Sequence, residues 1–282
     1  VPSVRGMIYD RNGDLLAENH AVYELEVIPE RVQDMPSMMA WMEAAISLSA
    51  SERRRFEKRL DNRASFERIL LKSDLSEAQA ARFAVNQYRF PGVALRARLK
   101  RFYPYGSLMA HAVGYVGRIS STDIATADRG HYRGMAYIGK LGIESYYERR
   151  LLGRIGYEQV ESNAHGRVVR TLAHEPAIGG HNLHLTLDRR LQEVVRAAFG
   201  DYRGAAVVLE PHTGEVLAFV SMPDYDANLF STGIDQVQYA ALQQDQGKPL
   251  LNRALYGRYA PGSTIKPILA LAGLEHTVNP RR

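Results

Sequence analysis

The sequence predicts an α+β fold, and three features of its 282 residues support this. Short β patterns separated by turn residues fill the N-terminal region. Helical patterns dominate residues 34–100. After about residue 181, two strand patterns form a pair and a helical pattern follows them. Because a chain of this length supports about two domains, we place a boundary here, between residues 1–180 and residues 181–282.

The N-terminal region is expected to form β-structure around one tight turn. Met7–Tyr9 is predicted to be a short strand. The turn follows at Asp10–Asp14, because its Asn-Gly pair supplies positive φ at low cost. Leu15–Ala17 and Val22–Val27 are predicted as two further strands, the second ending before Pro29.

Residues 34–100 are expected to form a helical insertion between β segments. Two capping signals support this interpretation. Ser51 is the expected N-cap of one helix, and Ser76 with Gln79 has the spacing of a capping box. The predicted elements are helices over 37–48, 51–60 and 76–86 and a strand over 93–99.

A group of methionines in this insertion allows two interpretations. Methionine-rich surfaces adapt to binding partners, but filling a hydrophobic core is the commoner use of the residue. The four are Met35, Met38, Met39 and Met42.

The rest of the chain mixes short helices with strands. Helices are predicted over 107–115 and 141–152, and a hairpin with arms 157–161 and 167–170 turns at 163–166. A linker at 176–180 leads to a strand over 183–187 and to Asp188, the expected N-cap of a helix over 189–199. Ala205–Leu209 and Glu215–Ser221 are predicted to form a central antiparallel pair, buried on both faces.

The composition narrows the classes of protein and site. The net charge is +5, but acidic and basic residues alternate, which is typical of solvated helix faces rather than of a nucleic-acid surface. The absence of cysteine excludes disulfides and thiolate metal sites. His181 and His184 face opposite ways on the predicted strand, so we expect no metal there, and no cofactor elsewhere. The apolar run Ile268–Leu274 is too short to span a bilayer.

The stretch RYAPGSTIKP contains the residues with chemical potential, Ser263 and Lys266. Pro267 is tolerated only near a helix start, so the helix is predicted to begin near Ser263 and to run to about Glu275. Residues three apart share a helix face, so Lys266 can take the hydroxyl proton and make Ser263 a nucleophile. Backbone N–H groups at the helix start can stabilise a developing oxyanion.

The tetrapeptide Ser-x-x-Lys is weak evidence by itself. Both residue types are common, so chance supplies about one such tetrapeptide in a chain of this length. An ordinary helix start is the structural alternative, and the residues alone leave both interpretations open.

Several stretches, taken in order, resemble the class B penicillin-binding proteins. The match covers nearly the whole chain and is weakest over the helical insertion. The matching stretches are Arg5–Gly13, Arg101–Gly106 with His111 and Gly114-Tyr115, Gly139–Glu144, Leu185–Asp188, Ala205–Asn228, Asn252-Arg253-Ala254 and Tyr259–Pro267.

The resemblance implies a fold and an activity. Residues 1–180 would form an elongated β-rich pedestal of the dimerisation type, with a helical head at about 34–100. Residues 181–282 would form the N-terminal part of a penicillin-binding/β-lactamase-like transpeptidase domain. The implied activity is that of a peptidoglycan D,D-transpeptidase that cross-links stem peptides during cell elongation and is a β-lactam target. Ser263 would be the catalytic nucleophile and Lys266 its general base.

The resemblance also implies partners and a location. The substrates would be stem peptides ending in D-Ala-D-Ala, and the protein partners would be the SEDS glycosyltransferase RodA and MreC. The parent protein would lie on the periplasmic side of the bacterial inner membrane through a single-pass anchor. The chain begins with Val1, so we expect the numbering to start inside a longer protein.

The remaining motif residues of the pedestal are expected to be structural. Arg5, Asp10 and Arg11 are predicted to hold strands and turns together, and Glu144 to be a buried ion-pair or cap residue rather than an acid catalyst. Core packing is the expected role of Tyr103 and Tyr105, with a partner groove as the alternative. Gly106, Gly114, Gly139 and Gly142 are predicted to be turn and packing positions.

One departure from the family pattern affects activity. The family carries a Ser-x-Asn and a Lys-Thr-Gly motif in the cleft, and neither follows Ser263 here. We therefore expect these 282 residues alone not to become acylated. Two alternatives to a transpeptidase stay open at this point: a pedestal that serves as a docking module, and a serine β-lactamase or penicillin-sensing receptor.

Overall fold

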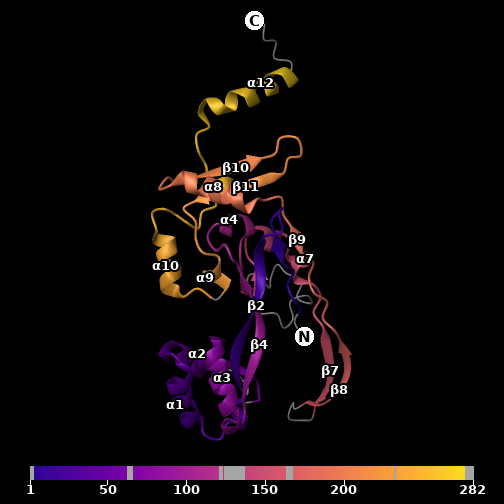
Figure 1. Cartoon of the computed structure of the whole chain (residues 1–282), viewed down its shortest axis with the longest axis vertical. Helices are drawn as coiled ribbons and strands as arrows, with labels where there is room; N and C mark the ends of the chain where they lie inside the picture. The colour runs from indigo at the N-terminus through magenta and orange to yellow at the C-terminus, as the bar shows by residue number, and fades with distance from the viewer. Residues whose placement is uncertain are drawn as a thin grey trace.

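The computed structural model describes residues 3–61, 66–120, 123, 137–162, 168–231 and 233–276. These residues form an elongated molecule with helices α1–α3 at one end and the hairpin β10–β11 towards the other (Figure 1). Helix α12 lies beyond this hairpin. The mixture of sheets and helices confirms the predicted α+β class.

A long strand, β2 (Leu15–Val27), organises the main sheet. It pairs antiparallel with β1 (Ile8–Tyr9), β3 (Ile69–Leu75) and β4 (Val93–Phe102). A short strand, β9 (Leu183–His184), pairs in parallel with β1. The two strands predicted at 15–17 and 22–27 are thus one strand, because pairing with β4 continues without a break from Glu18 to Val27.

The helical insertion lies between the C-terminal end of β2 and the N-terminal end of β4, and we call residues 28–92 the head lobe. Its elements are η1 (Pro29–Arg31), α1 (Met35–Ile46), α2 (Ala50–Leu60), α3 (Glu77–Asn86) and η2 (Gln87–Arg89). The capping box of Ser76 and Gln79 is confirmed. Ser51 is not a cap, because Ser49 and Glu52 form the capping box that begins α2.

The methionines of the head lobe fill its core. Met38, Met39 and Met42 are buried at 1%, 4% and 0% exposure. They contribute to one cluster with residues from the sheet and from the other head helices, among them Leu25, Val27, Phe56, Ile69 and Phe83. Core filling is therefore the use that this structure makes of these three methionines.

The middle of the chain is more broken than predicted. The helix expected over 107–115 is only α4 (Ala110–Val113), which ends at Gly114 with φ +78°. A side chain at Gly114 would place its Cβ 1.9 Å from the Leu141 carbonyl oxygen, so only glycine fits. The helix expected over 141–152 is divided at Tyr147 into α6 (Gly142–Tyr146) and α7 (Glu148–Leu152).

Two antiparallel pairs flank these helices. Strands β5 (Val116–Arg118) and β6 (Tyr137–Gly139) form the first pair. The predicted hairpin is present as β7 (Tyr157–Ser162) and β8 (Val168–Glu175), while its turn at 163–166 lies outside the described residues. The strand predicted over 183–187 is only β9, because the chain turns there towards the N-cap of the next helix.

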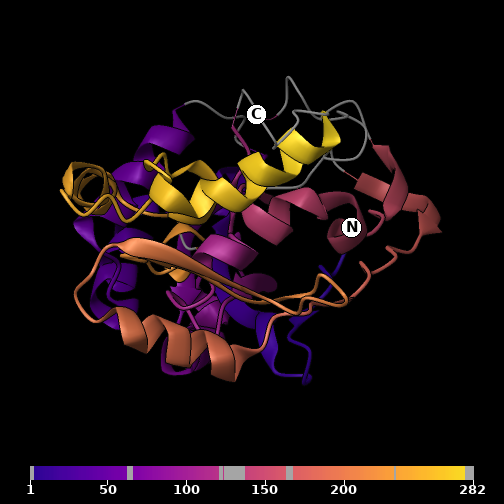
Figure 2. The same cartoon turned by 90° about the horizontal axis from the view of Figure 1, so that it is seen from above.

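The C-terminal part begins with α8 (Arg189–Phe199), whose N-cap is Asp188 as predicted. Helix α8 packs along the antiparallel pair β10 (Gly204–Leu209) and β11 (Val216–Met222) (Figure 2). The predicted burial of this pair on both faces is wrong. Val207 and Leu209 are 45% and 57% exposed, whereas Ala218 and Val220, whose side chains lie on the other face of the pair, are buried.

A second core joins the two predicted domains. It contains pedestal residues such as Ile8, Tyr103 and Leu151 together with Tyr225 and Phe230 from beyond residue 181. Packing is thus continuous across the predicted boundary at 180.

A buried group of charges lies beside this core, and we call Arg5, Arg101, Glu144 and Glu148 the charge cluster. Glu144 is fully buried and accepts hydrogen bonds from Arg5 Nε and Arg101 Nε, each at 2.7 Å. Arg5 Nη2 also lies 2.6 Å from Glu148 Oε2. The predicted structural roles of Arg5 and Glu144 are confirmed by these contacts.

Tyr103 extends the charge cluster towards β5. Its hydroxyl donates to Glu144 Oε1 over 3.2 Å and accepts the Val116 N–H over 2.8 Å. Tyr103 is 2% exposed, so its predicted role in core packing is confirmed.

Replacing Glu144 by glutamine should destabilise the protein strongly. The change leaves two largely buried arginines with one carboxylate between them, and breaking a buried charge pair costs about 3–5 kcal/mol. Chemical denaturation measures this loss. The control is Glu161→Gln, which breaks the exposed pair with Arg170 and should cost at most about 1 kcal/mol.

Glu144 should also make the free energy of unfolding depend on pH in the acid range. Burial alone would raise the pKa of Glu144, but the charges and hydrogen bonds of Arg5 and Arg101 lower it below its ordinary value of 4.5. Its contribution to stability is therefore complete above pH 4.5 and is lost as the pH falls below that value. The free energy of unfolding of Glu144→Gln should fall less steeply than that of the wild type in this range. Equal slopes would contradict the assignment.

Candidate active site

The predicted nucleophile and base lie at the start of the last described helix. Ser263 belongs to η3 (Gly262–Ile265), and Lys266 is the first residue of α12 (Lys266–Glu275). The Thr264 N–H donates to the Pro261 carbonyl oxygen and the Lys266 N–H to the Ser263 carbonyl oxygen, so helical hydrogen bonding begins within two residues of the serine. The predicted helix start near Ser263 is therefore confirmed.

The residue before the serine must be glycine. Gly262 has φ +56°, a left-handed conformation that costs an L-residue about 1–2 kcal/mol. No atom lies within 4 Å of the place where a Cβ would be added, so the backbone angle and not crowding requires glycine. The preceding Pro261 has φ −69°, and its carbonyl oxygen accepts the Thr264 hydroxyl proton.

The 3₁₀ geometry of η3 controls the relation between Ser263 and Lys266. In a 3₁₀-helix, side chains at i and i+3 stand one above the other. These two residues have that spacing across η3 and its continuation into α12. Among the described residues, neither the Ser263 hydroxyl nor the Lys266 amine has a side-chain hydrogen-bond partner, and both residues are exposed.

Helix α12 is apolar and exposed. Ile268 and Leu274 are 65% and 67% exposed, and Leu269 and Leu271 are similarly open. The helix lies apart from the hairpin β10–β11 (Figure 1). In the described part of the chain, the serine and lysine therefore stand on a projecting helix and not inside a cleft.

The segment that leads to this helix is anchored by residues that belong to a stretch resembling the family but to which the sequence analysis assigned no role. It contains α9 (Asn228–Ser231), α10 (Gln236–Gln244) and α11 (Arg253–Tyr256). Asn252 is the N-cap of α11, and Arg253 is buried although it is charged. The Ser221 hydroxyl of β11 accepts the Arg253 N–H at 2.9 Å. The sequence carried no signal for these contacts beyond the capping preference of asparagine.

The start of α8 is hydrogen-bonded to the N-terminal turn at Asp10–Asp14. Asp10 is fully buried and accepts N–H groups from Asn12, Asp14 and Arg189 at 2.7, 2.9 and 3.1 Å. Burial alone would raise the pKa of Asp10, but these hydrogen bonds lower it. Arg11 lies 3.5 Å from Glu215, which confirms that Asp10 and Arg11 hold turns together.

Neither a metal-binding cluster nor a membrane-spanning helix is present among the described residues. No group of three or more histidine, cysteine, aspartate or glutamate side chains in the described ranges is arranged to hold a metal ion. Within the same ranges, no helix combines the length and the apolar character that crossing a membrane requires.

The chain matches two protein families. Residues 1–185 match the family "Penicillin-binding Protein dimerisation domain", and residues 204–281 match the family "Penicillin binding protein transpeptidase domain".

The chain is also similar to curated relatives. It is 44% identical to peptidoglycan D,D-transpeptidase MrdA of Escherichia coli K12, over 96% of this chain and 43% of the relative. It is 40% identical to MrdA of Acinetobacter baumannii, over 99% of this chain and 41% of the relative. The chain thus spans less than half the length of these relatives.

Solved structures resemble the fold. The penicillin-binding protein PBP2 in a complex with MreC from Helicobacter pylori has a TM-score of 0.79 at 29% identity, and the match covers 100% of this chain and 52% of that one. Pseudomonas aeruginosa PBP2 in complex with WCK 5153 has a TM-score of 0.62 at 33% identity, with 99% of this chain and 42% of that one covered.

Replacing Gly262 by alanine should loosen the helix start. The left-handed angle costs alanine about 1–2 kcal/mol, so amide hydrogen exchange over residues 263–276 should become faster. The matched control is Gly273→Ala inside α12, where nothing lies within 4 Å of the new Cβ. That variant should slow exchange, since alanine favours a helix by up to about 1 kcal/mol. Faster exchange in both variants would contradict the role of the Gly262 angle.

Proposed function

Since this chain belongs to the penicillin-binding proteins that join a dimerisation domain to a transpeptidase domain, we propose that its protein is a peptidoglycan D,D-transpeptidase of the penicillin-binding protein 2 type. Residues 1–180 are the pedestal, and residues 181–282 begin the transpeptidase domain. The observation that carries the proposal is the position of Ser263 and Lys266 on consecutive turns at the start of α12, within the matched transpeptidase region.

The proposed reaction uses Ser263 as nucleophile. Its Oγ attacks the carbonyl carbon of the penultimate D-alanine of a stem peptide, while its proton passes to the Lys266 amine. The tetrahedral intermediate collapses, the bond to the terminal D-alanine breaks, and Lys266 returns the proton to the leaving amine. An amine of a neighbouring stem peptide then attacks the acyl-serine, which forms the cross-link and releases Ser263.

The backbone at the helix start supports this chemistry. N–H groups in the first turn of a helix have no helical partner and can donate to an oxyanion. The Ser263 N–H occupies such a position, because the first backbone hydrogen bond of η3 is donated one residue later, by the Thr264 N–H.

The family resemblance also suggests where the protein acts and with what. We propose that it works on the periplasmic side of the inner membrane during cell elongation, beside the glycosyltransferase RodA. A solved PBP2 with MreC is similar to this chain, which favours an MreC-type protein as a second partner.

The pedestal offers a surface for such a partner on the head lobe. Val85 and Tyr88, at the end of α3 and in η2, are 75% and 83% exposed. Exposed tyrosines at the centre of an interface often carry much of the binding energy. We therefore propose docking as a second function of the chain, compatible with the enzymatic one.

Substitutions at Ser263 and Lys266 test the enzymatic proposal. The experiment uses a chimera in which residues 1–282 replace the matching part of an MrdA relative, so that Ser263 is its active-site serine, and a fluorescent penicillin reports acylation. Ser263→Ala should abolish labelling, and Lys266→Ala should slow it by about 10²–10⁴-fold, the usual contribution of a general base.

The controls separate the alternatives. The 282-residue chain without Ser-x-Asn and Lys-Thr-Gly motifs should stay unlabelled. Labelling that survives Ser263→Ala would sink the assignment of the nucleophile. Fast turnover of nitrocefin, in place of a long-lived acyl-enzyme, would identify a β-lactamase.

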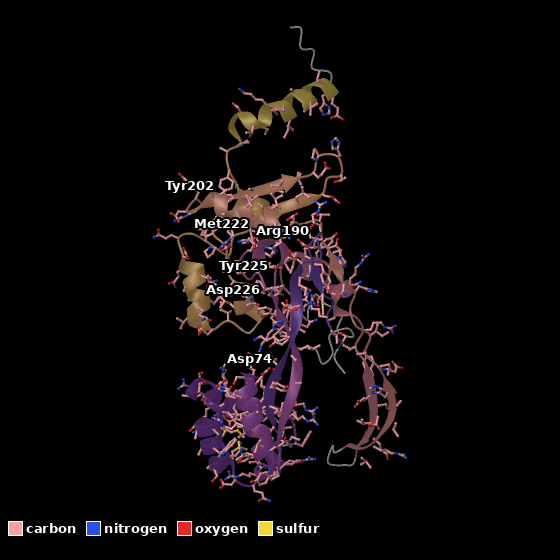
Figure 3. All side chains as sticks on the ribbon, viewed as in Figure 1. Asp74, Arg190, Tyr202, Met222, Tyr225 and Asp226 are labelled. Atoms are coloured by element: carbon pink, nitrogen blue, oxygen red, sulfur yellow. The ribbon has the colours of Figure 1, made fainter. Side chains whose placement is uncertain are left out.

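Substitution of Tyr88 by alanine tests the docking proposal. Binding of an MreC-type protein should weaken by about tenfold in Kd, since an exposed aromatic anchor is lost. The control is Tyr202→Ala, because Tyr202 is 82% exposed but lies near the opposite end of the molecule (Figure 3). Equal affinities for the wild type and Tyr88→Ala would remove the head lobe from the interface.

A further inference from the structure

Asn252 connects the pedestal to the segment that carries the serine. Its Nδ2 donates to the His111 carbonyl oxygen over 3.0 Å, although the two residues are 141 positions apart. His111 belongs to α4 of the pedestal, and Asn252 immediately precedes α11. We propose that this contact makes Asn252 a positioning residue, which fixes the approach of the chain to Ser263 relative to the pedestal. The inference rests on the proposed function of Ser263.

The same side chain has a second role at its other end. Its Oδ1 accepts the Leu255 N–H at 3.3 Å, and its carbonyl oxygen accepts the Tyr256 N–H at 2.8 Å. Asn252 therefore caps α11 while it donates to α4. The start of α11 is therefore capped by a side chain whose other amide atom, Nδ2, is hydrogen-bonded to the pedestal.

The next residue, Arg253, holds the stretch before α11 in place through a second set of hydrogen bonds. Arg253 is 8% exposed, and its guanidinium donates to the carbonyl oxygens of Lys248 and Gly247 over 3.0 and 2.5 Å. Its N–H donates to the Ser221 hydroxyl, which donates in turn to the Leu251 carbonyl oxygen over 3.2 Å. The stretch 247–253 is thus held against β11 before the chain reaches α11.

Strand β11 is itself held by the pedestal through Gln192 of α8. The Gln192 amide donates to the Leu108 and Phe219 carbonyl oxygens over 3.0 and 2.7 Å, and it accepts the Phe219 N–H at 2.7 Å. Figure 3 shows Met222, at the end of β11, above Tyr225 and Asp226. Two routes, through Gln192 and through Asn252, therefore join pedestal carbonyl groups to this segment.

Helix α11 is the last anchored element before the serine. Between Tyr256 and Gly262 the chain has no helix or strand, and most of its side chains are exposed. The six residues from Gly257 to Gly262 therefore start from a fixed point at α11. A change in the direction of α11 moves the start of η3, where a displacement of about 1 Å can cost a catalytic site up to about 10²-fold in rate.

An aspartate at position 252 separates positioning from simple capping. Aspartate caps a helix as well as asparagine does, so the contact with the Leu255 N–H is kept. A carboxylate cannot donate to the His111 carbonyl oxygen, so the link to the pedestal is lost. The matched control is Asn86→Asp in the head lobe, which makes the same change in charge and also loses an amide donor to a carbonyl oxygen, that of Arg82.

The experiment measures acylation by a fluorescent penicillin in the chimera in which residues 1–282 replace the matching part of an MrdA relative. Asn252→Asp should lower the acylation rate constant at saturating penicillin by about tenfold, with the apparent affinity and the melting temperature close to wild type. Asn86→Asp should change neither constant. In the 282-residue chain, Asn252→Asp should also raise amide exchange over residues 257–266, and Asn86→Asp should not.

The outcomes distinguish this inference from the function on which it rests. If the wild type is labelled at Ser263 and Asn252→Asp reacts at the same rate, the positioning role falls while the enzymatic proposal stands. If the rate falls only in proportion to a lower melting temperature, the bond to His111 stabilises the fold without positioning the serine, and the inference is overturned. If the wild type is not labelled at all, the proposed function falls and the positioning role with it.

Discussion

One carboxylate, that of Glu144, brings together parts of the chain that are far apart in sequence. Arg5, which precedes β1, and Arg101, near the end of β4, each donate to one of its two oxygens at 2.7 Å. The Glu144 side chain is fully buried. A buried charge is tolerated only when it is paired and hydrogen-bonded, so each member of this group constrains the others. The N-terminal segment, the end of β4 and the helix α6 must therefore meet in one arrangement.

This arrangement provides the platform for the C-terminal part of the chain. The second core unites Ile8 and Tyr103 of the pedestal with Tyr225 and Phe230 from beyond the predicted boundary. Buried polar contacts reinforce that packing, since Asp10 accepts the first N–H of α8 and Gln192 bonds to both Leu108 and β11. The pedestal body and the strands next to the serine segment are consequently one folded unit, while α12 projects from it.

Local signals predicted much of the fold, because they depend on neighbouring residues. The capping box at Ser76 and the N-cap Asp188 are examples, as is the helix start near Ser263. Ser49 and not Ser51 caps α2, because Glu52 lies three positions after Ser49 and completes a capping box with it. Burial of β10–β11 was predicted wrongly, since an apolar run does not say how many of its faces are covered.

Contacts between distant residues could not be read from spacing at all. The motif residues of the charge cluster were expected to be structural, but their partners emerged only from the fold. Ser263 and Lys266 could be paired from the sequence because helical geometry brings residues three apart together, whereas nothing in the spacing of Asn252 and His111, 141 positions apart, indicates their hydrogen bond.

The most direct test of this account is native-state amide hydrogen exchange on the intact chain, compared between β1, the end of β4, β11 and α11. If the pedestal and the stretch from β11 to α11, which leads to the serine, form one cooperative unit, the slowest amides of these four elements should exchange with one common opening free energy. The account would be contradicted if β11 and α11 opened at a much lower free energy than β1 and β4, because the serine segment would then fold independently of the pedestal.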